Sequence, residues 1–264
     1  FFAGVTDYLK TNAYGTGEAH QLRLSLEKIS GKDLNWFFNQ WYFGSGNPVI
    51  DVVKKYNAAT KKLTVKIVQT QDEKILFQFP LEIDVYENGK RVRHKVWVDA
   101  RKENSFTFPV ATTPELVDIN PRGVIIATEN NNKSWKEYLY QLQHATDYKS
   151  RIEAVEATTA TEGKEILLTA LKDPFFKVRE KALQKLISYK LTPKELQIVE
   201  KVAETDSANL VKAAAIWVLA ATKDKKYSAI FEKALSIPSG AIKIPAKATA
   251  IDDEVFMNNR EITS

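Results

Sequence analysis

The chain has 264 residues, of which 44% are hydrophobic and 27% are charged, a balance typical of a globular protein with two or more domains. Its formal net charge of +5 is spread along the chain, which gives no support for binding to nucleic acid or to an anionic membrane. The absence of cysteine excludes disulfides and thiolate chemistry, and no apolar run approaches the roughly 18 residues that span a bilayer.

The beginning of the chain is predicted to form short helices. Apolar residues recur at helical spacing, first at Phe2 and Leu9 and then at Leu22 and Leu26, and Thr16 is placed to cap the second helix. The sequence starts as if inside a helix, without an initiator Met or a basic leader, so we expect a fragment of a longer protein. Helices this short need a partner, either upstream sequence or the segment that follows.

An aromatic block follows, with the sequence SGKDLNWFFNQWYFGSGNP from Ser30 to Pro48. Gly31 is predicted to end one helix in the left-handed conformation, and Asp33 is predicted to cap the next. Because the block holds a single cation, its rings indicate a buried joint between two units better than a surface on which nucleic-acid bases stack. We expect Trp41 to be buried in this joint, and Trp41→Ala to cost about 3–5 kcal/mol of stability.

The predicted helix of this block carries one apolar stripe, with members at positions i, i+3, i+4 and i+7. These are Leu34, Phe37, Phe38 and Trp41. Gly44, Gly46 and Pro48 are predicted to end the helix and release an extended chain.

The next eighty residues switch to a period of two, which is typical of strands. Asn88-Gly89 lies between two such runs and predicts a two-residue hairpin, because both positions accept a positive φ. The number and spacing of the runs predict an antiparallel β-sandwich of about seven strands. The expected strands are 49–56, 63–68, 81–86, 91–99, 105–108, 116–119 and 124–128.

The densest basic cluster lies on one of these strands, at Arg91, Arg93, His94 and Lys95. We interpret it as a solvated strand edge, which charge protects from aggregation. A binding role would require a second basic strand beside it.

The remainder returns to helical spacing and contains an internal repeat. Asp173, Arg179 and Leu186 recur thirty-three residues later as Asp206, Lys212 and Leu219, and Arg151 and Ala154 belong to a weaker upstream copy. The pattern resembles HEAT-type helical repeats, and that resemblance implies that Asp173 or Asp206 pairs with Arg179 or Lys212 along the stack. The end of the chain, with clusters at 242–245 and 252–257, is expected to be an irregular or capping segment.

No catalytic or metal-binding constellation is recognisable. His20, His94 and His144 are far apart in sequence, none has a second histidine at i+3 or i+4, and there is no H-E-x-x-H, so each is interpreted as an ordinary surface or capped residue. Gly15-Thr16-Gly17 lacks the context of a phosphate loop, and the acidic pairs Asp72-Glu73 and Asp252-Asp253 are interpreted as solvated charges. We therefore predict no catalytic residue, no metal ligand and no cofactor in this chain, and its binding residues stay unknown.

The order of the segments resembles the C-terminal part of zinc aminopeptidases of the aminopeptidase N type, the gluzincin aminopeptidases. The residues that carry the resemblance are Phe2-Ala3-Gly4, Tyr8-Leu9, Thr16, Leu26-Glu27, Ser30-Gly31-Lys32-Asp33-Leu34, Trp41, Gly46, Pro48, Gln69 and Phe79-Pro80-Leu81. The resemblance is specific in the first 85 residues and generic from there to about residue 235.

The resemblance implies a multidomain α+β chain with three parts. Residues 1–47 would be the helical end of a thermolysin-like catalytic domain, 48–130 a β-sandwich domain, and 131–264 an all-α HEAT-like domain. The family's H-E-x-x-H zinc motif, its later glutamate and its glycine-rich substrate motif would all lie upstream, so this chain would bind no zinc and cleave nothing.

The implied function is that of the noncatalytic end of a zinc metalloaminopeptidase, whose parent removes N-terminal residues from peptides. The sandwich would brace the catalytic domain and the helical domain would wall the substrate chamber. The alternative is a noncatalytic scaffold, a sandwich plus a HEAT-like repeat that grips a protein partner. Compartment, oligomeric state and the parent's substrate preference stay open.

Overall fold

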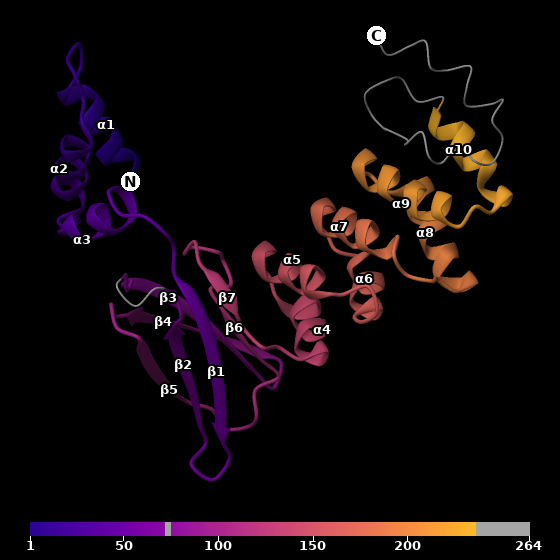
Figure 1. Ribbon diagram of the computed structural model, residues 1–264, viewed down its shortest axis with the longest axis horizontal. Coiled ribbons are helices and arrows are strands. Elements are labelled where there is room, and N and C mark those ends of the chain that lie inside the picture. The colour runs from indigo at the N-terminus through magenta and orange to yellow at the C-terminus, as the bar shows by residue number, and fades with distance from the viewer. Residues whose placement is uncertain (72–74, 236–264) are drawn as a thin grey trace.

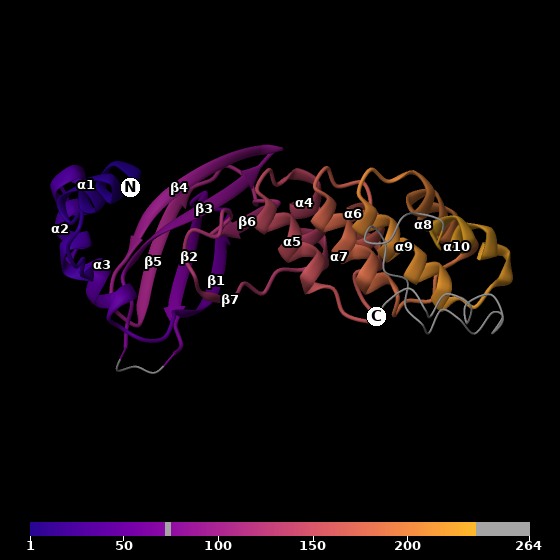
Figure 2. The same ribbon diagram turned by 90° about the horizontal axis from the view of Figure 1, so that it is seen from above.

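The computed structural model describes residues 1–71 and 75–235. Its parts follow one another along the molecule: short helices at one end, two β-sheets in the middle and a stack of helices at the other end (Figures 1 and 2). This is the mixed α+β arrangement that the sequence predicted. The acidic pairs Asp72-Glu73 and Asp252-Asp253, and the expected capping segment at the end of the chain, lie outside the described residues.

The N-terminal helices are α1 (Phe2–Thr11), α2 (Ala19–Ser30), α3 (Asn35–Phe37) and the π-helix η1 (Phe38–Tyr42). Gly31 ends α2 with φ 67°, as predicted, and Asp33 accepts the backbone N–H of Asn35 at 2.8 Å. Thr16 does not cap α2. In the first turn of α2, the side chain of Gln21 instead accepts a hydrogen bond from the N–H of Glu18 at 2.8 Å.

The predicted aromatic helix is interrupted by the π-turn, in which the N–H of Phe43 bonds to the carbonyl of Phe38 at 2.9 Å. A π-turn holds an extra residue and shifts the phase of the helix, so the four stripe residues do not share one buried face. Phe38 is buried, Trp41 is half-buried and Phe37 is exposed.

Two sheets form the β-sandwich. One has the order β5-β2-β1-β7 and the other β4-β3-β6. Alternate side chains of facing strands, such as Val65 and Ile67 on one sheet and Leu81 and Ile83 on the other, are buried between them. The strands are β1 (Val49–Asn57), β2 (Lys62–Gln69), β3 (Phe79–Glu87), β4 (Lys90–Val98), β5 (Glu103–Pro109), β6 (Leu116–Ile119) and β7 (Thr128–Asn130).

One detail of the sandwich agrees with the prediction and two differ from it. The hairpin turn at Asn88-Gly89 forms with positive φ at both residues, as predicted. The last strand, however, is not 124–128 but β7, and it pairs with β1 in parallel, so the sandwich is not purely antiparallel. The cause is local: the side chain of Asn120 bonds to both the N–H and the carbonyl of Ile125, so these backbone groups are paired with a side chain and not with a neighbouring strand.

The helical repeat consists of stacked antiparallel pairs, α4 with α5, α6 with α7 and α8 with α9 (Figure 1). Small and branched side chains such as Ala182 and Val211 are fully buried between them, so neighbouring helices approach closely. The helices are α4 (Trp135–His144), α5 (Tyr148–Ala157), α6 (Lys164–Ala170), α7 (Phe176–Leu186), α8 (Pro193–Thr205) and α9 (Asn209–Ala221), followed by the 3₁₀-helix η2 (Lys225–Tyr227) and α10 (Ser228–Leu235).

Candidate functional site

The three histidines do not converge. His20 lies on α2 beside Arg23, His94 lies on β4 stacked 4.1 Å from the ring of Phe108, and His144 ends α4. Burial lowers the pKa of His94, which therefore favours its neutral form. In the described part of the chain, no group of three or more His, Asp or Glu side chains is arranged to hold a metal ion.

Gly15-Thr16-Gly17 lies in the link between α1 and α2 and not between a strand and a helix, the setting that a phosphate loop requires. Within the described ranges, no helix is long and apolar enough to cross a membrane. The features that remain as functional candidates are contact surfaces and the joints between the parts of the chain.

The basic strand β4 is an edge strand, as predicted, but its central arginine is not a solvated charge. Arg93 donates to both oxygens of the fully buried Asp84, at 2.7 and 2.8 Å, and to Asp147 at 2.6 Å. These bonds, chiefly those to Asp84, raise the pKa of Arg93. Because Asp147 directly precedes the first residue of α5, the arginine ties the sandwich to the first helix pair.

The same type of contact continues through the helical repeat. Arg151 of α5 bonds at 2.7 Å to Asp173, which lies in the turn between α6 and α7. Arg179 of α7 bonds at 2.7 Å to Asp206, which lies in the turn between α8 and α9. The resemblance to HEAT repeats implied the pairing of Asp206 with Arg179. We call the three contacts, including the one from Arg93, the Arg–Asp ladder. It links the sandwich and three helix pairs in series.

A second contact between sandwich and repeat is a buried ionic joint around Lys133. Its ammonium donates to Asp118 of β6 at 2.8 Å, to Gln141 of α4 at 2.7 Å and to Glu153 of α5 at 3.1 Å. Ser150 adds a hydrogen bond to Asp118. Burial of Lys133 lowers its pKa, but the two carboxylates outweigh that effect and the net shift is upward, so the side chain stays charged.

The ionic joint should make the chain sensitive to acid. Burial raises the pKa of Glu153, but Lys133 and Lys149 outweigh it and hold the pKa below its ordinary value of 4.5. A depressed carboxyl pKa stabilises the fold above the ordinary pKa, and this contribution is lost as the pH falls through the folded-state pKa. We expect Glu153→Gln to have a lower melting temperature than the native chain at pH 7. This difference in melting temperature should narrow as the pH falls below 4.5.

Thermal unfolding at several pH values checks this expectation. Glu156→Gln is the matched control, because Glu156 lies on the same helix with an exposed carboxylate. If the melting temperature of Glu153→Gln stays below that of the native chain by the same amount down to pH 3, Glu153 does not stabilise the fold through its charge.

Trp41 contacts the sandwich, at 5.4 Å from the ring of the buried Phe77. Beside it, the side chain of Gln40 bonds to both the N–H and the carbonyl of Gln78, each at 2.9 Å. The predicted joint therefore exists, although Trp41 is half-buried and not fully buried as we expected.

The partial burial of Trp41 reduces the expected cost of its truncation. Trp41→Ala should lower the free energy of unfolding by about 2 kcal/mol instead of the larger loss typical of a fully buried tryptophan. Phe43→Ala, at a ring that is 62% exposed, is the control and should cost well under half as much. Urea denaturation measures both, and an equal loss in the two variants would rule out a stabilising contact of Trp41.

The N-terminal helices expose an unusual amount of apolar surface. Of the 22 large hydrophobic side chains that are exposed among the described residues, nine lie in the first 43 residues, whereas Phe38 is the single buried hydrophobic side chain of that stretch. Such exposure is typical of a contact surface. We call these nine the N-terminal apolar surface: Phe1, Phe2, Leu9, Tyr14, Leu24, Ile29, Phe37, Tyr42 and Phe43.

Sequence reasoning anticipated the need for a partner here, but it placed Phe37 in the buried stripe. It also missed the contact of Arg93 with Asp84 and the ionic joint, because the partners of Arg93 and Lys133 lie on other strands and helices.

Comparison with known proteins supports the repeat and the overall fold. The family model of HEAT repeats matches residues 134–220. No curated protein matches the sequence. A solved structure with a similar fold is the aminopeptidase A of Legionella pneumophila in complex with aspartic acid, with a TM-score of 0.52 and 19% sequence identity.

The alignment with that aminopeptidase covers 93% of this chain but 30% of the other. At this level of identity the likeness concerns the fold alone.

Proposed function

We propose that this chain is the noncatalytic part of a zinc aminopeptidase and that it contacts the catalytic domain through its N-terminal apolar surface. In this proposal residues 1–47 complete the catalytic domain, 48–130 form a bracing sandwich domain, and 131–264 form a helical domain that walls the substrate chamber. The peptide substrate and the zinc belong to the parent enzyme. The chain itself contributes no catalytic residue.

The observation that carries the proposal is the N-terminal apolar surface. Phe2 and Leu9 are 83% and 62% exposed, although they lie seven residues apart on one face of α1. Leaving these two side chains exposed to water instead of burying them costs about 1.5–3 kcal/mol of free energy each. The likeness to an aminopeptidase supports a catalytic domain as the partner.

The test uses the protein encoded by the reading frame extended upstream of Phe1. We expect the double variant Phe2→Glu with Leu9→Glu to lower its melting temperature and its aminopeptidase activity, because two charges would be forced into a domain contact. Val92→Glu, at an exposed apolar residue on the edge strand β4, is the control and should change neither quantity. Native-like activity and stability of the double variant would show that the surface is not covered in the longer protein.

The alternative function, a scaffold that binds a protein partner, is favoured by the match to HEAT repeats. It predicts an extended protein without a zinc motif. The presence or absence of H-E-x-x-H upstream therefore separates the two functions.

A further inference from the structure

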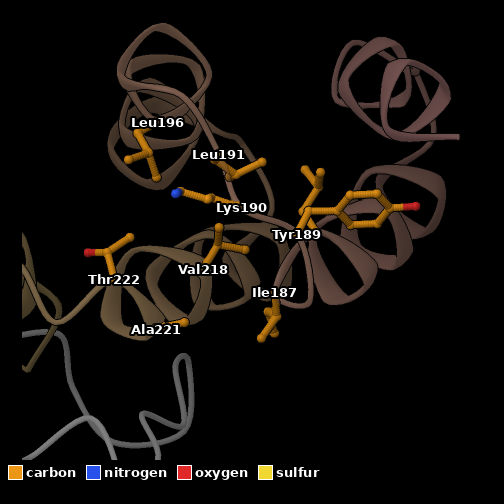
Figure 3. Close-up of a pocket in the computed structure, with 9 residues that line it drawn as sticks. Ile187, Tyr189, Lys190, Leu191, Leu196, Val218, Ala221 and Thr222 are labelled. Atoms are coloured by element: carbon orange, nitrogen blue, oxygen red, sulfur yellow. The ribbon is translucent and has the colours of Figure 1, made fainter. Parts of the chain in front are cut away.

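The helical repeat contains a cavity that neither the ionic joint nor the Arg–Asp ladder uses. It has a volume of about 290 Å³ and lies where the end of α7, the start of α8 and the end of α9 meet (Figure 3). Its lining residues are Leu186, Ile187, Tyr189, Lys190, Leu191, Leu196, Val218, Ala221 and Thr222.

The walls of this cavity are mostly apolar, and some of them are open to solvent. Val218 is buried, Leu191 and Leu196 are half-buried, and Ile187 is 41% exposed. Figure 3 shows the Lys190 ammonium between Leu196 and Thr222. No side chain within the described residues forms an ion pair with this ammonium.

Exposed lysines adjoin the lining residues along the chain, and we call them the rim. Lys194 lies in the first turn of α8, two residues before Leu196, and Lys223 and Lys225 come one and three residues after Thr222; all three are exposed. The carboxylates nearby are already engaged, Glu195 with Lys164 at 2.9 Å and Asp224 with Lys226 at 3.3 Å. An apolar hollow with an excess of positive charge around it is complementary to an apolar group flanked by carboxylates.

We propose that this cavity docks an acidic peptide segment of a partner protein. One large apolar side chain of the segment enters between Ile187 and Leu196, and its neighbouring carboxylates pair with Lys190 and the lysines of the rim. The apolar side chains line a hollow and do not project as a ridge, which suits an inserted side chain better than a membrane surface. The proposal does not depend on the aminopeptidase function.

Fluorescence anisotropy with the full chain tests the proposal. The probe is a fluorescein-labelled peptide with a central Leu-Phe flanked by two glutamates on each side. We expect saturable binding with a Kd on the order of 0.1 mM that weakens as salt is added. Peptides with lysine in place of glutamate, or serine in place of Leu-Phe, should bind at least about tenfold more weakly.

Variants of the chain locate the binding. Lys190→Glu reverses the charge of the lysine that lines the cavity, and Ala221→Trp fills the cavity. Each variant should weaken binding by about tenfold or more. Lys172→Glu reverses an exposed charge at the opposite end of α7 and should change the Kd less than about twofold. Unchanged circular dichroism and melting temperature confirm that the variants are folded.

Three results would overturn the proposal. The acidic peptide could fail to bind saturably, or Lys190→Glu and Lys172→Glu could weaken binding equally. The third is binding to phosphatidylserine vesicles that Lys190→Glu abolishes while the peptide does not bind, which would identify a membrane-facing surface instead.

Discussion

Lys133→Met is expected to lower the free energy of unfolding by about 3–5 kcal/mol, because removing one partner leaves buried charges without compensation. The ammonium lies between Asp118 and Glu153 with no exposed side-chain surface of its own. Methionine preserves most of the side-chain volume, so the loss reports the charge and its hydrogen bonds and not a cavity.

Urea denaturation of Lys133→Met measures this effect, and Lys136→Met on the exposed face of α4 is the matched control. Adding Asp118→Asn and Glu153→Gln to Lys133→Met should recover part of the loss, because the unpaired carboxylates are then neutral. If Lys133→Met and Lys136→Met are equally stable, the ionic joint does not hold the repeat on the sandwich.

Arg179→Leu is expected to cost about 2–4 kcal/mol, the second largest effect. The guanidinium bonds to both oxygens of Asp206 and to the carbonyls of Asp173 and Pro174, so leucine leaves several acceptors unpaired. Burial raises the pKa of Asp206, but the bonds from Arg179 and the N–H of Ala208 outweigh it and hold the pKa below its ordinary value.

The conservative variant separates charge from geometry. Arg179→Lys keeps the positive charge but cannot bond to both oxygens of Asp206, so we expect an intermediate loss in urea denaturation. Lys172→Leu in the neighbouring turn is the control and should cost less than about 0.5 kcal/mol. A loss in Arg179→Leu no larger than in this control would show that the Arg–Asp ladder does not stabilise the stack.

The parts of the fold that the sequence predicted are those that depend on local patterns. Alternation placed the buried faces of β2 and β3, Asn88-Gly89 specified its hairpin, and the recurrence of Asp173 as Asp206 located the helix pairs. Each of these signals acts over a few residues or repeats at a fixed interval, so it can be read without knowledge of the tertiary structure.

The errors arose where tertiary contacts override a local pattern. The π-turn at Phe38 allows Gln40 to pair with the backbone of Gln78, thirty-eight residues away, and no helical periodicity contains that information. Likewise β7 is a strand because it lies beside β1, and its own three residues carry no strand pattern.

The ionic joint and the cavity could not be predicted for a related reason. Lys133 and Asp118 each look like an ordinary solvated charge in sequence, and burial is conferred on them by the packing of α4 and α5 against β6. The cavity is lined by residues from the ends of α7 and α9 and from the start of α8, which only the stacking of the helix pairs brings together (Figure 3).

The most direct measurement is the zinc content and aminopeptidase activity of two purified proteins, this chain alone and the product of the same reading frame extended upstream of Phe1. The proposed function predicts one tightly bound zinc and release of N-terminal residues from peptides for the extended protein, and neither for this chain. An extended protein without zinc and activity, or stoichiometric tight zinc in this chain alone, would contradict it.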